Sequence, residues 1–264
     1  MELRIFWGKG VMELDNMLVY PVGNTSACRF ASAFLEQAGI RLVDHAAPEV
    51  THLMLDVPSF GADGLLRGGG DLKHILEMLP ENAVIVGGNL VHPALKGYQT
   101  LDLLKDAQYL AKNAAITADC ALQVAAPLMT ATFAHSPALI IGWGRIGKCL
   151  GQLLRSVGSE VTIAARKETD RAMIRALGFD AVEISKIPEL LPKCRLLFNT
   201  APELILRKEE FRSCKHCIKI DLASTPGIEG DAVVWARGLP GVYAPESSGR
   251  LIAETFLRLS GEVS

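Results

Sequence analysis

The sequence lacks an excess of charge of either sign. It has 27 lysine and arginine residues against 29 aspartate and glutamate residues, which gives a formal net charge of −2 and an isoelectric point near 6.3. Nucleic acids and anionic membranes attract proteins through clustered positive charge, and this chain has no overall positive charge to offer. We therefore expect neither nucleic acid nor a membrane surface among its partners.

Long hydrophobic runs are also missing. The most apolar window, residues 121–143, is interrupted by polar residues and prolines, whereas a transmembrane helix needs about 20 predominantly apolar residues. Residues 1–23 lack the basic segment and apolar core of a signal peptide. The 6 cysteines are irregularly spaced, which is typical of reduced thiols in a chain with a large core. These features indicate a cytoplasmic protein.

The residue patterns of several enzyme classes are absent. Cys214 and Cys217 flank His216, but no second close Cys/His pair follows at the spacing of a zinc site, so we expect no metal. The histidines show neither HxH nor HxxxH spacing, and there is no G-x-S-x-G nucleophile elbow. A 2-hydroxy-acid dehydrogenase typically carries an acid/base histidine before its last helices, and no histidine follows His216. The absence of such a histidine argues against the hydride chemistry of a 2-hydroxy-acid dehydrogenase.

What the sequence does contain is an alternation of short β-branched runs with segments of helical periodicity. This alternation is typical of parallel sheets that are covered by helices. The fold class is therefore expected to be α/β, with two Rossmann-like doubly wound domains and a cleft between them. The predicted strands are 17–22, 51–57, 83–86, 138–141, 161–165, 181–184, 196–199, 218–222 and 232–236, and the clearest helices are 27–38, 71–79 and 247–259.

A long helix is predicted over residues 100–126, with or without a break near Asn113, as the bridge between the domains. We expect an N-terminal substrate and catalytic domain over residues 1–115 and an NADP-binding Rossmann domain over residues 116–245. The remaining segment, residues 246–264, should be a C-terminal helix that packs back toward the first domain.

The strongest motif is the glycine-rich turn that runs from Gly142 through Gly144, Arg145 and Ile146 to Gly147, between a buried-type strand and an amphipathic helix. In a dinucleotide site the first glycine permits the tight turn, the second lets the backbone approach a pyrophosphate, and the third lets the helix pack on the strand. The helix N-terminus supplies N–H donors for the phosphates. A strand–helix turn without a ligand is the alternative, but the context on both sides favours dinucleotide binding.

The strand after this motif predicts which dinucleotide is bound. An NAD site has Asp or Glu at the end of that strand, whereas this chain has Arg166, about 20 residues after Gly147, followed by Lys167. A guanidinium can bind a 2′-phosphate, and the lysine adds charge. A solvated basic pair is the alternative. We predict NADP.

Further motifs of the second half are Ala164-Ala165-Arg166, Asn199-Thr200-Ala201-Pro202, Asp221-Leu222-Ala223-Ser224 with Pro226-Gly227, and 238–245 followed by Ser248-Gly249. Together with the glycine-rich turn, these motifs resemble the A subunit of dipicolinate synthase. Their order and spacing match over about half the chain. The resemblance implies an enzyme that uses NADP to oxidise a hydroxylated tetrahydrodipicolinate to pyridine-2,6-dicarboxylate during sporulation, with a flavoprotein-like second subunit.

Ligands of doubly wound sheets bind outside the carboxyl ends of the strands, where several of these motifs fall. We expect the loops that follow two adjacent strands, and the Pro/Gly-rich loop before the last helix, to line the cofactor. Ordinary turn chemistry is the alternative, because Asn, Asp, Ser and Pro all favour turns. The residues assigned to the cofactor in these loops are Asn199, Thr200, Pro202, Asp221, Ala223, Ser224 and Pro240.

Three residues are candidates for catalysis. Asp119, with Thr117 beside it, is expected on the interdomain helix as a general base, and an exposed helix acid is the alternative. Ser248 begins the last helix and can bind a substrate carboxylate, or simply cap that helix. The expected partners are a small dicarboxylate substrate, further copies of the chain and the second subunit. Two other hypotheses stay open: a related dehydrogenase of another small carboxylate, and a non-catalytic NADP-binding subunit.

Overall fold

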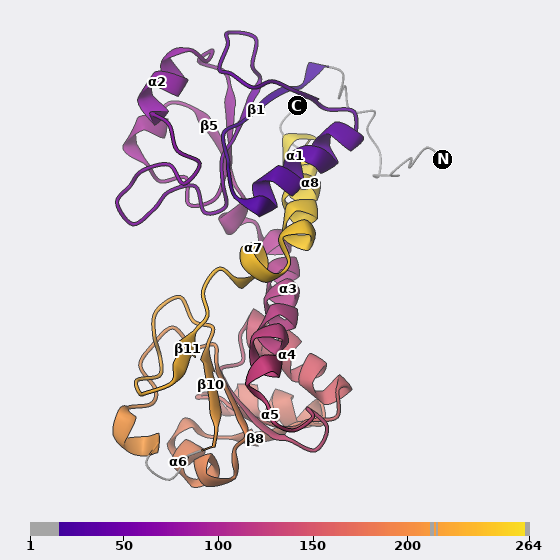
Figure 1. Cartoon of the computed structure of the whole chain (residues 1–264), viewed down its shortest axis with the longest axis vertical. Coiled ribbons are helices and arrows are strands. Elements are labelled where there is room, and N and C mark those ends of the chain that lie inside the picture. The colour runs from indigo at the N-terminus through magenta and orange to yellow at the C-terminus, as the bar shows by residue number, and fades with distance from the viewer. Residues whose placement is uncertain (1–15, 212–213, 215, 262–264) are drawn as a thin grey trace. The chain divides into compact units, whose positions relative to one another are not determined.

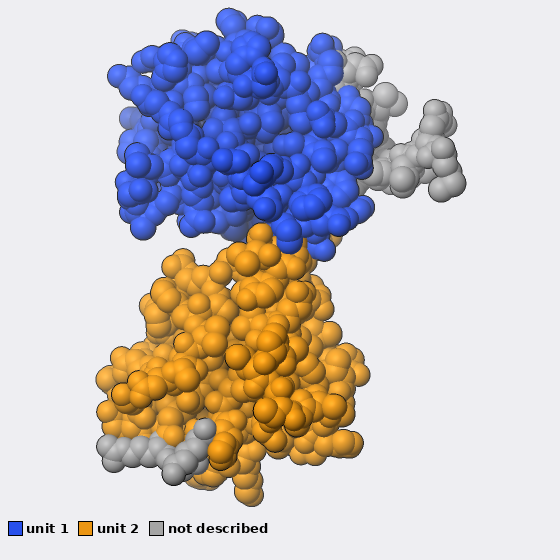
Figure 2. Space-filling view, in the orientation of Figure 1, with its two compact units in different colours: residues 1–110, 245–264 blue, residues 111–244 orange. Residues whose placement is uncertain are grey.

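The computed structural model describes residues 16–211, 214 and 216–261 of the 264-residue chain. The chain folds as two compact units (Figure 2). Unit 1 combines the residues up to Leu110 with those from Pro245 onward, and unit 2 runs from Ala111 to Ala244.

In its described part, unit 1 holds a five-stranded parallel sheet in the order β2-β1-β3-β4-β5. Figure 1 labels strands β1 and β5 of this sheet. Leucine, isoleucine and valine side chains from the central strands are fully buried in its core. The elements of unit 1 are β1 (Leu18–Pro21), α1 (Ser26–Gln37), β2 (Arg41–Leu42), β3 (His52–Met54), α2 (Leu72–Glu77), β4 (Val84–Gly87), η2 (Pro93–Leu95), β5 (Gln99–Asp102), η3 (Leu103–Lys105) and α8 (Pro245–Gly261).

Helix α8 packs closely against α1 at Gly249. A methyl group added to Gly249 would lie 2.6 Å from the carbonyl oxygen of Ala27 and 2.8 Å from the backbone nitrogen of Ala31. Such close approach is possible only for glycine, which explains why Gly249 stands at this position of α8. The C-terminal helix is thereby an integral part of unit 1.

The described part of unit 2 holds a six-stranded parallel sheet in the order β11-β10-β9-β6-β7-β8. Helix α3 begins at the end of unit 1 and continues into unit 2 without a break at Asn113. The elements are α3 (Ala107–Ala125), η4 (Ala126–Leu128), β6 (Pro137–Ile141), α4 (Arg145–Ser156), β7 (Glu160–Ala164), α5 (Glu168–Ala176), β8 (Asp180–Val182), η5 (Ile184–Lys186), α6 (Ile187–Leu190), η6 (Leu191–Lys193), β9 (Leu196–Asn199), η7 (Lys208–Phe211), β10 (Ile218–Asp221), β11 (Val233–Trp235) and α7 (Leu239–Tyr243).

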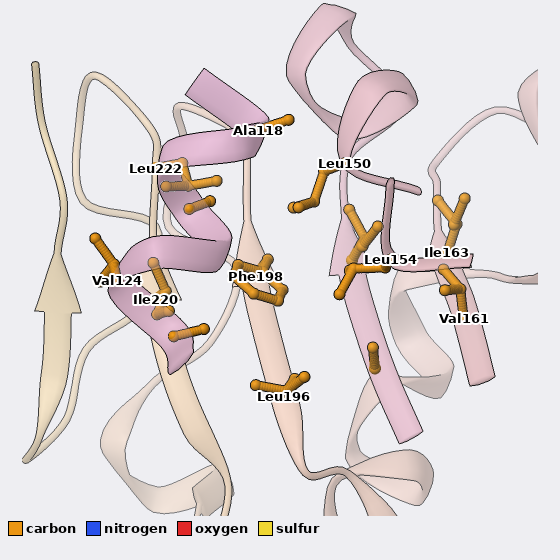
Figure 3. Packing of buried hydrophobic residues seen from close by; sticks show 14 of the residues in the cluster. Ala118, Val124, Leu150, Leu154, Val161, Ile163, Leu196, Phe198, Ile220 and Leu222 are labelled. Atoms are coloured by element: carbon orange, nitrogen blue, oxygen red, sulfur yellow. The ribbon is translucent and has the colours of Figure 1, made fainter. Parts of the chain in front are cut away.

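The sheet of unit 2 is buried on both faces. On one face, Phe198 lies between the side chains of α3, such as Ala118, and those of α4, such as Leu150 (Figure 3). On the other face, Leu197 packs with Ile187 of α6 in a second cluster. Successive strand residues point to opposite faces, so burial of both faces requires the nearly continuous apolar runs that the sequence shows.

The predicted start of the interdomain helix, at residue 100, is wrong, because α3 begins at Ala107. Residues 99–102, predicted mostly as helix, form β5, in which Thr100 and Leu101 pair with β4. The side chain of Asp102 then accepts hydrogen bonds from the backbone of Asn89, Leu90 and Leu104, each at 3.0 Å. Tertiary pairing along an edge strand overrides local helical preference here.

His52 is a buried titratable group of unit 1. Its ring lies 5.3 Å from that of Phe256 between centroids, and its Nδ1 lies 2.9 Å from Oγ1 of Thr51. Burial lowers the pKa of His52 to about 4. The folded protein therefore holds this ring neutral through a pH range in which the unfolded chain would protonate it.

We expect the free energy of unfolding to fall as the pH drops from 6.5 toward 4, because the unfolded state binds a proton at His52 that the folded state rejects. The loss from this residue should be on the order of 2–3 kcal/mol. Denaturant unfolding at pH 7 and pH 4.5 measures it, with His52→Leu as the comparison. A variant that loses as much stability as the wild type would show that His52 is not responsible.

Candidate dinucleotide-binding site

The glycine-rich turn joins β6 to α4 with very little free space. Gly142 has a φ of +103°, and a methyl group added to it would lie 2.5 Å from Oγ1 of Thr200. A methyl group added to Gly147 would lie 2.3 Å from the carbonyl oxygen of Gly142. Both positions therefore require glycine, one for the left-handed backbone and both for close packing.

Gly144 is different, because nothing lies within 4 Å of the position that its Cβ would take. It is the N-cap residue of α4, and no side chain caps that helix. The first N–H groups of a helix need partners, and they favour an anion. Open space above an uncapped helix N-terminus is the arrangement that accepts a pyrophosphate.

A pocket of about 310 Å³ lies beside this turn, within unit 2. Its volume is at the lower end of the range for ligand pockets, about 300–1,000 Å³. The loops that follow β6, β7 and β9 supply most of its lining, which consists of Ile141, Gly142, Trp143, Gly144, Ala164, Ala165, Arg166, Lys167, Asp170, Ile184, Thr200, Ala201, Pro202, Glu203 and Ile205.

Arg166 and Lys167 reach this pocket from the end of β7. The side chain of Arg166 is 70% exposed, and its Nη1 lies 2.8 Å from Oε1 of Glu203. Nη1 of Arg171 donates to the carbonyl oxygens of both Ala165 and Arg166 at 2.7 Å. Arg171 thus fixes the backbone on which Arg166 stands.

Asn199 and Asp221 were predicted to line the cofactor, but both side chains are fully buried. Nδ2 of Asn199 donates to Oδ1 of Asp221 at 2.9 Å and to the carbonyl oxygen of Ala201 at 3.0 Å. Oδ2 of Asp221 accepts from the backbone N–H groups of Gly227 at 2.6 Å and Ile228 at 3.1 Å. With their polar atoms bonded inside the protein, these side chains hold the loops after β9 and β10 in place rather than facing a ligand.

The other predicted cofactor residues fall into two groups. Thr200 and Pro202 line the pocket, and Oγ1 of Thr200 donates to the carbonyl oxygen of Ile141 at 2.9 Å. The structure does not place the rest of the set at this pocket. Arg145 is exposed on the first turn of α4, Ile146 packs against the core, Ala223 and Pro240 are buried, and Ser224 is exposed.

The candidate catalytic residues lie in both units. Asp119 and Thr117 belong to the part of α3 in unit 2, whereas Ser248 belongs to α8 in unit 1, where it is 5% exposed. Thr117 is buried, and its hydroxyl donates to the carbonyl oxygen of Asn113 at 2.8 Å. Asp119 is exposed. Burial, and then the charge of Asp119, raises the pKa of the Cys149 thiol, so this carboxylate lies near α4.

The turn between β1 and α1 in unit 1 also joins a parallel strand to a helix, but its backbone N–H groups are bonded to a side chain of the protein. Asp56 is buried, and its carboxylate accepts from the backbone N–H groups of Asn24 and Thr25 at 3.1 Å. It also accepts from the hydroxyl of Thr25, the residue that caps α1. A protein carboxylate thus already accepts from the backbone of this turn, and an anion placed beside it would be repelled.

Two further features belong to the described residues. No group of three or more His, Cys, Asp and Glu side chains among them could hold a metal ion, and Cys214 and Cys217 are buried thiols. None of the helices in that part of the chain is both long and apolar enough to cross a membrane.

The fold and the open glycine-rich turn define a Rossmann-type protein with a candidate dinucleotide site. No family model matches the chain. A 141-residue segment is 27% identical to the A subunit of dipicolinate synthase from Bacillus subtilis (strain 168), and the match covers 50% of this chain and 48% of that protein. The chain thus spans about half the length of this curated relative, and the resemblance predicted from its motifs is confirmed.

Solved structures share the architecture. The A subunit of dipicolinate synthase from Bacillus halodurans has a TM-score of 0.80 at 20% identity, with 92% of this chain and 97% of that chain covered. A transhydrogenase from Sinorhizobium meliloti has a TM-score of 0.72 at 14% identity, with 93% and 94% covered. At these identities the likeness shows the fold, so the predicted α/β class with two Rossmann-like sheets is confirmed.

Two glycines of the same turn should behave differently when substituted. Gly147→Ala should lower the free energy of unfolding by about 1–3 kcal/mol, because its methyl group meets backbone. Gly144→Val should cost no more than about 1 kcal/mol, because the site is open and only the preference for glycine over valine at an N-cap is lost, while weakening dinucleotide binding at least about tenfold. Denaturant unfolding and fluorescence titration with NADP measure the two effects. Equal loss of stability in both variants would contradict this assignment.

Proposed function

We propose that this chain is an NADP-dependent oxidoreductase that dehydrogenates a small dicarboxylate, as the resemblance to the A subunit of dipicolinate synthase implies. The observation that carries the proposal is the open space at Gly144, above the uncapped N-terminus of α4. It leaves room for a pyrophosphate, and the N–H groups of the first turn of α4 bind its oxygens.

The basic residues after β7 support NADP as the coenzyme. In Rossmann sites the ribose lies at the end of the second strand of the motif, which here is β7. Arg166 and Lys167 stand there, and a guanidinium binds a phosphate with several N–H groups. Arg171 holds the loop that carries Arg166 and Lys167. The buried pair Asn199–Asp221 holds the loop after β9 on the other side of the pocket.

When bound, the nicotinamide coenzyme supplies hydride transfer. The chain itself binds and orients the coenzyme and the substrate, and it accepts a proton from the substrate. Asp119 is the candidate base, since it presents an exposed carboxylate on α3 that takes the proton lost as the substrate is oxidised. Thr117 accompanies it on the same helix, and Ser248 stays a candidate for the substrate carboxylate.

The substrate and the partners follow from the same resemblance. The curated relative is named as one subunit of a synthase of dipicolinate, which is a pyridine dicarboxylate. Its substrate class suggests a hydroxylated tetrahydrodipicolinate for this chain, and its name suggests a second subunit, which we take to be flavoprotein-like. A role in spore formation, and assembly as a homo-oligomer, belong to the same proposal.

The proposal predicts that Asp119→Asn lowers kcat at least about 100-fold, the usual contribution of a general base, while NADP affinity stays within about threefold. The assay, run with and without the second subunit, combines the purified chain, NADP and substrate generated in situ, and it follows the absorbance of pyridine-2,6-dicarboxylate. Asp180→Asn is the matched control, because Asp180 is an exposed carboxylate at the start of β8. Wild-type protein that binds NADP but shows no turnover in either mixture would instead be a non-catalytic subunit.

Arg166→Gln should weaken NADP binding about 10- to 100-fold and change NAD affinity by less than about threefold, because only NADP carries the 2′-phosphate. Isothermal titration with both coenzymes gives the ratio of affinities. Lys193→Gln, at an exposed lysine outside the pocket, is the control for the loss of one positive charge. If the ratio stays at its wild-type value, Arg166 does not select the coenzyme.

A further inference from the structure

Arg166 has a charged neighbour on the opposite side of the glycine-rich turn. Its Nη1 lies 2.8 Å from Oε1 and 3.1 Å from Oε2 of Glu203. Strands β7 and β9 pair with β6 on its two sides, so this ion pair joins the loops that flank the turn. Both side chains line the pocket.

This ion pair contributes little to the stability of the fold. The side chains of Arg166 and Glu203 are 70% and 45% exposed, and exposed ion pairs add little to stability. Both contacts come from Nη1, and a guanidinium carries further N–H groups on Nε and Nη2 with which it can bind a second anion. An anion bound by those further groups of Arg166 would therefore lie beside the Glu203 carboxylate.

We infer that Glu203 is a specificity-determining residue that lowers the preference of this site for a 2′-phosphorylated coenzyme. The inference rests on the proposed function. A phosphate monoester carries a charge between about −1.5 and −2, and beside Arg166 it would lie a few ångströms from the Glu203 carboxylate. Repulsion at that distance in water weakens binding on the order of tenfold. The 2′-hydroxyl of NAD carries no charge and can donate a hydrogen bond to a carboxylate.

The acid that an NAD site carries at the end of its second strand is thus supplied here from another loop. The end of β7 offers Ala165 and Arg166, and the carboxylate comes from Glu203 after β9. Selection between the two coenzymes then depends on the balance between Arg166 and Glu203. Such a balance gives a narrower preference for NADP than Arg166 would give alone.

Glu203→Gln tests this, because it removes the charge and keeps the size of the side chain. Wild type, Glu203→Gln and Glu160→Gln are titrated with NADP, NAD and adenosine 2′,5′-bisphosphate. Glu160 is an exposed carboxylate at the other end of β7, so its variant has the same change of net charge. We expect Glu203→Gln to raise the NADP:NAD affinity ratio about tenfold, equivalent to about 1.4 kcal/mol, and the affinity for the bisphosphate by a similar factor. Glu160→Gln should stay within about twofold of the wild type.

The possible failures can be told apart. If the wild type binds coenzyme but Glu203→Gln leaves the ratio unchanged or lowers it, or if Glu160→Gln raises it equally, Glu203 has no such role and the proposed function stands. If the wild type binds neither NADP nor NAD at millimolar concentration, the proposed function fails and this inference fails with it. Thermal melts of the three proteins show that each titration uses folded protein.

Discussion

The candidate site depends on one close backbone approach, between the turn that ends β6 and the first turn of α4. Gly147 lies so near the carbonyl oxygen of Gly142 that no side chain fits between them. This contact brings the start of the helix onto the end of the strand, and Thr200, from the loop after β9, closes the other side of Gly142. The close contacts among these three residues restrict the position of the helix N-terminus. The space beside Gly144 stays open.

The loops around that turn are held by buried polar groups rather than by apolar packing. Asn199 and Asp221 lie at the carboxyl ends of neighbouring strands, and each bonds to the loop that follows its own strand as well as to the other. Arg171 does the same for the backbone after β7. A buried polar group left without a partner costs free energy, so these networks restrict each loop to the conformation that satisfies all of them. Such restraint prepares a binding site before the ligand arrives.

Most strands, and the open turn, could be predicted from the sequence, because both depend on local patterns: apolar runs bounded by turn residues, and glycines at fixed spacing. Strand β5 could not, since Thr100 and Leu101 are strand residues only by virtue of pairing with β4. Glu203 was missed for a similar reason. Nothing in its local sequence distinguishes it from a surface glutamate, and its pairing with Arg166 depends on the order of β7, β6 and β9 in the sheet. Asn199 and Asp221 were located correctly at strand ends, but burial, which decides whether such a side chain meets a ligand or a loop, is a tertiary property.

The two units show how one architecture leads to different chemistry. Each has a parallel sheet in which a strand, a glycine-containing turn and a helix follow one another, and the first turn of each helix favours a negative group. In unit 1 the Thr25 hydroxyl caps the first turn of α1, and the buried carboxylate of Asp56 accepts from the backbone N–H groups of Asn24 and Thr25 just before it. In unit 2 no side chain caps the corresponding helix, and in the proposed function the coenzyme supplies the charge. The turn of unit 1 is thus bonded within the protein, whereas the turn of unit 2 leaves the start of its helix open to a ligand.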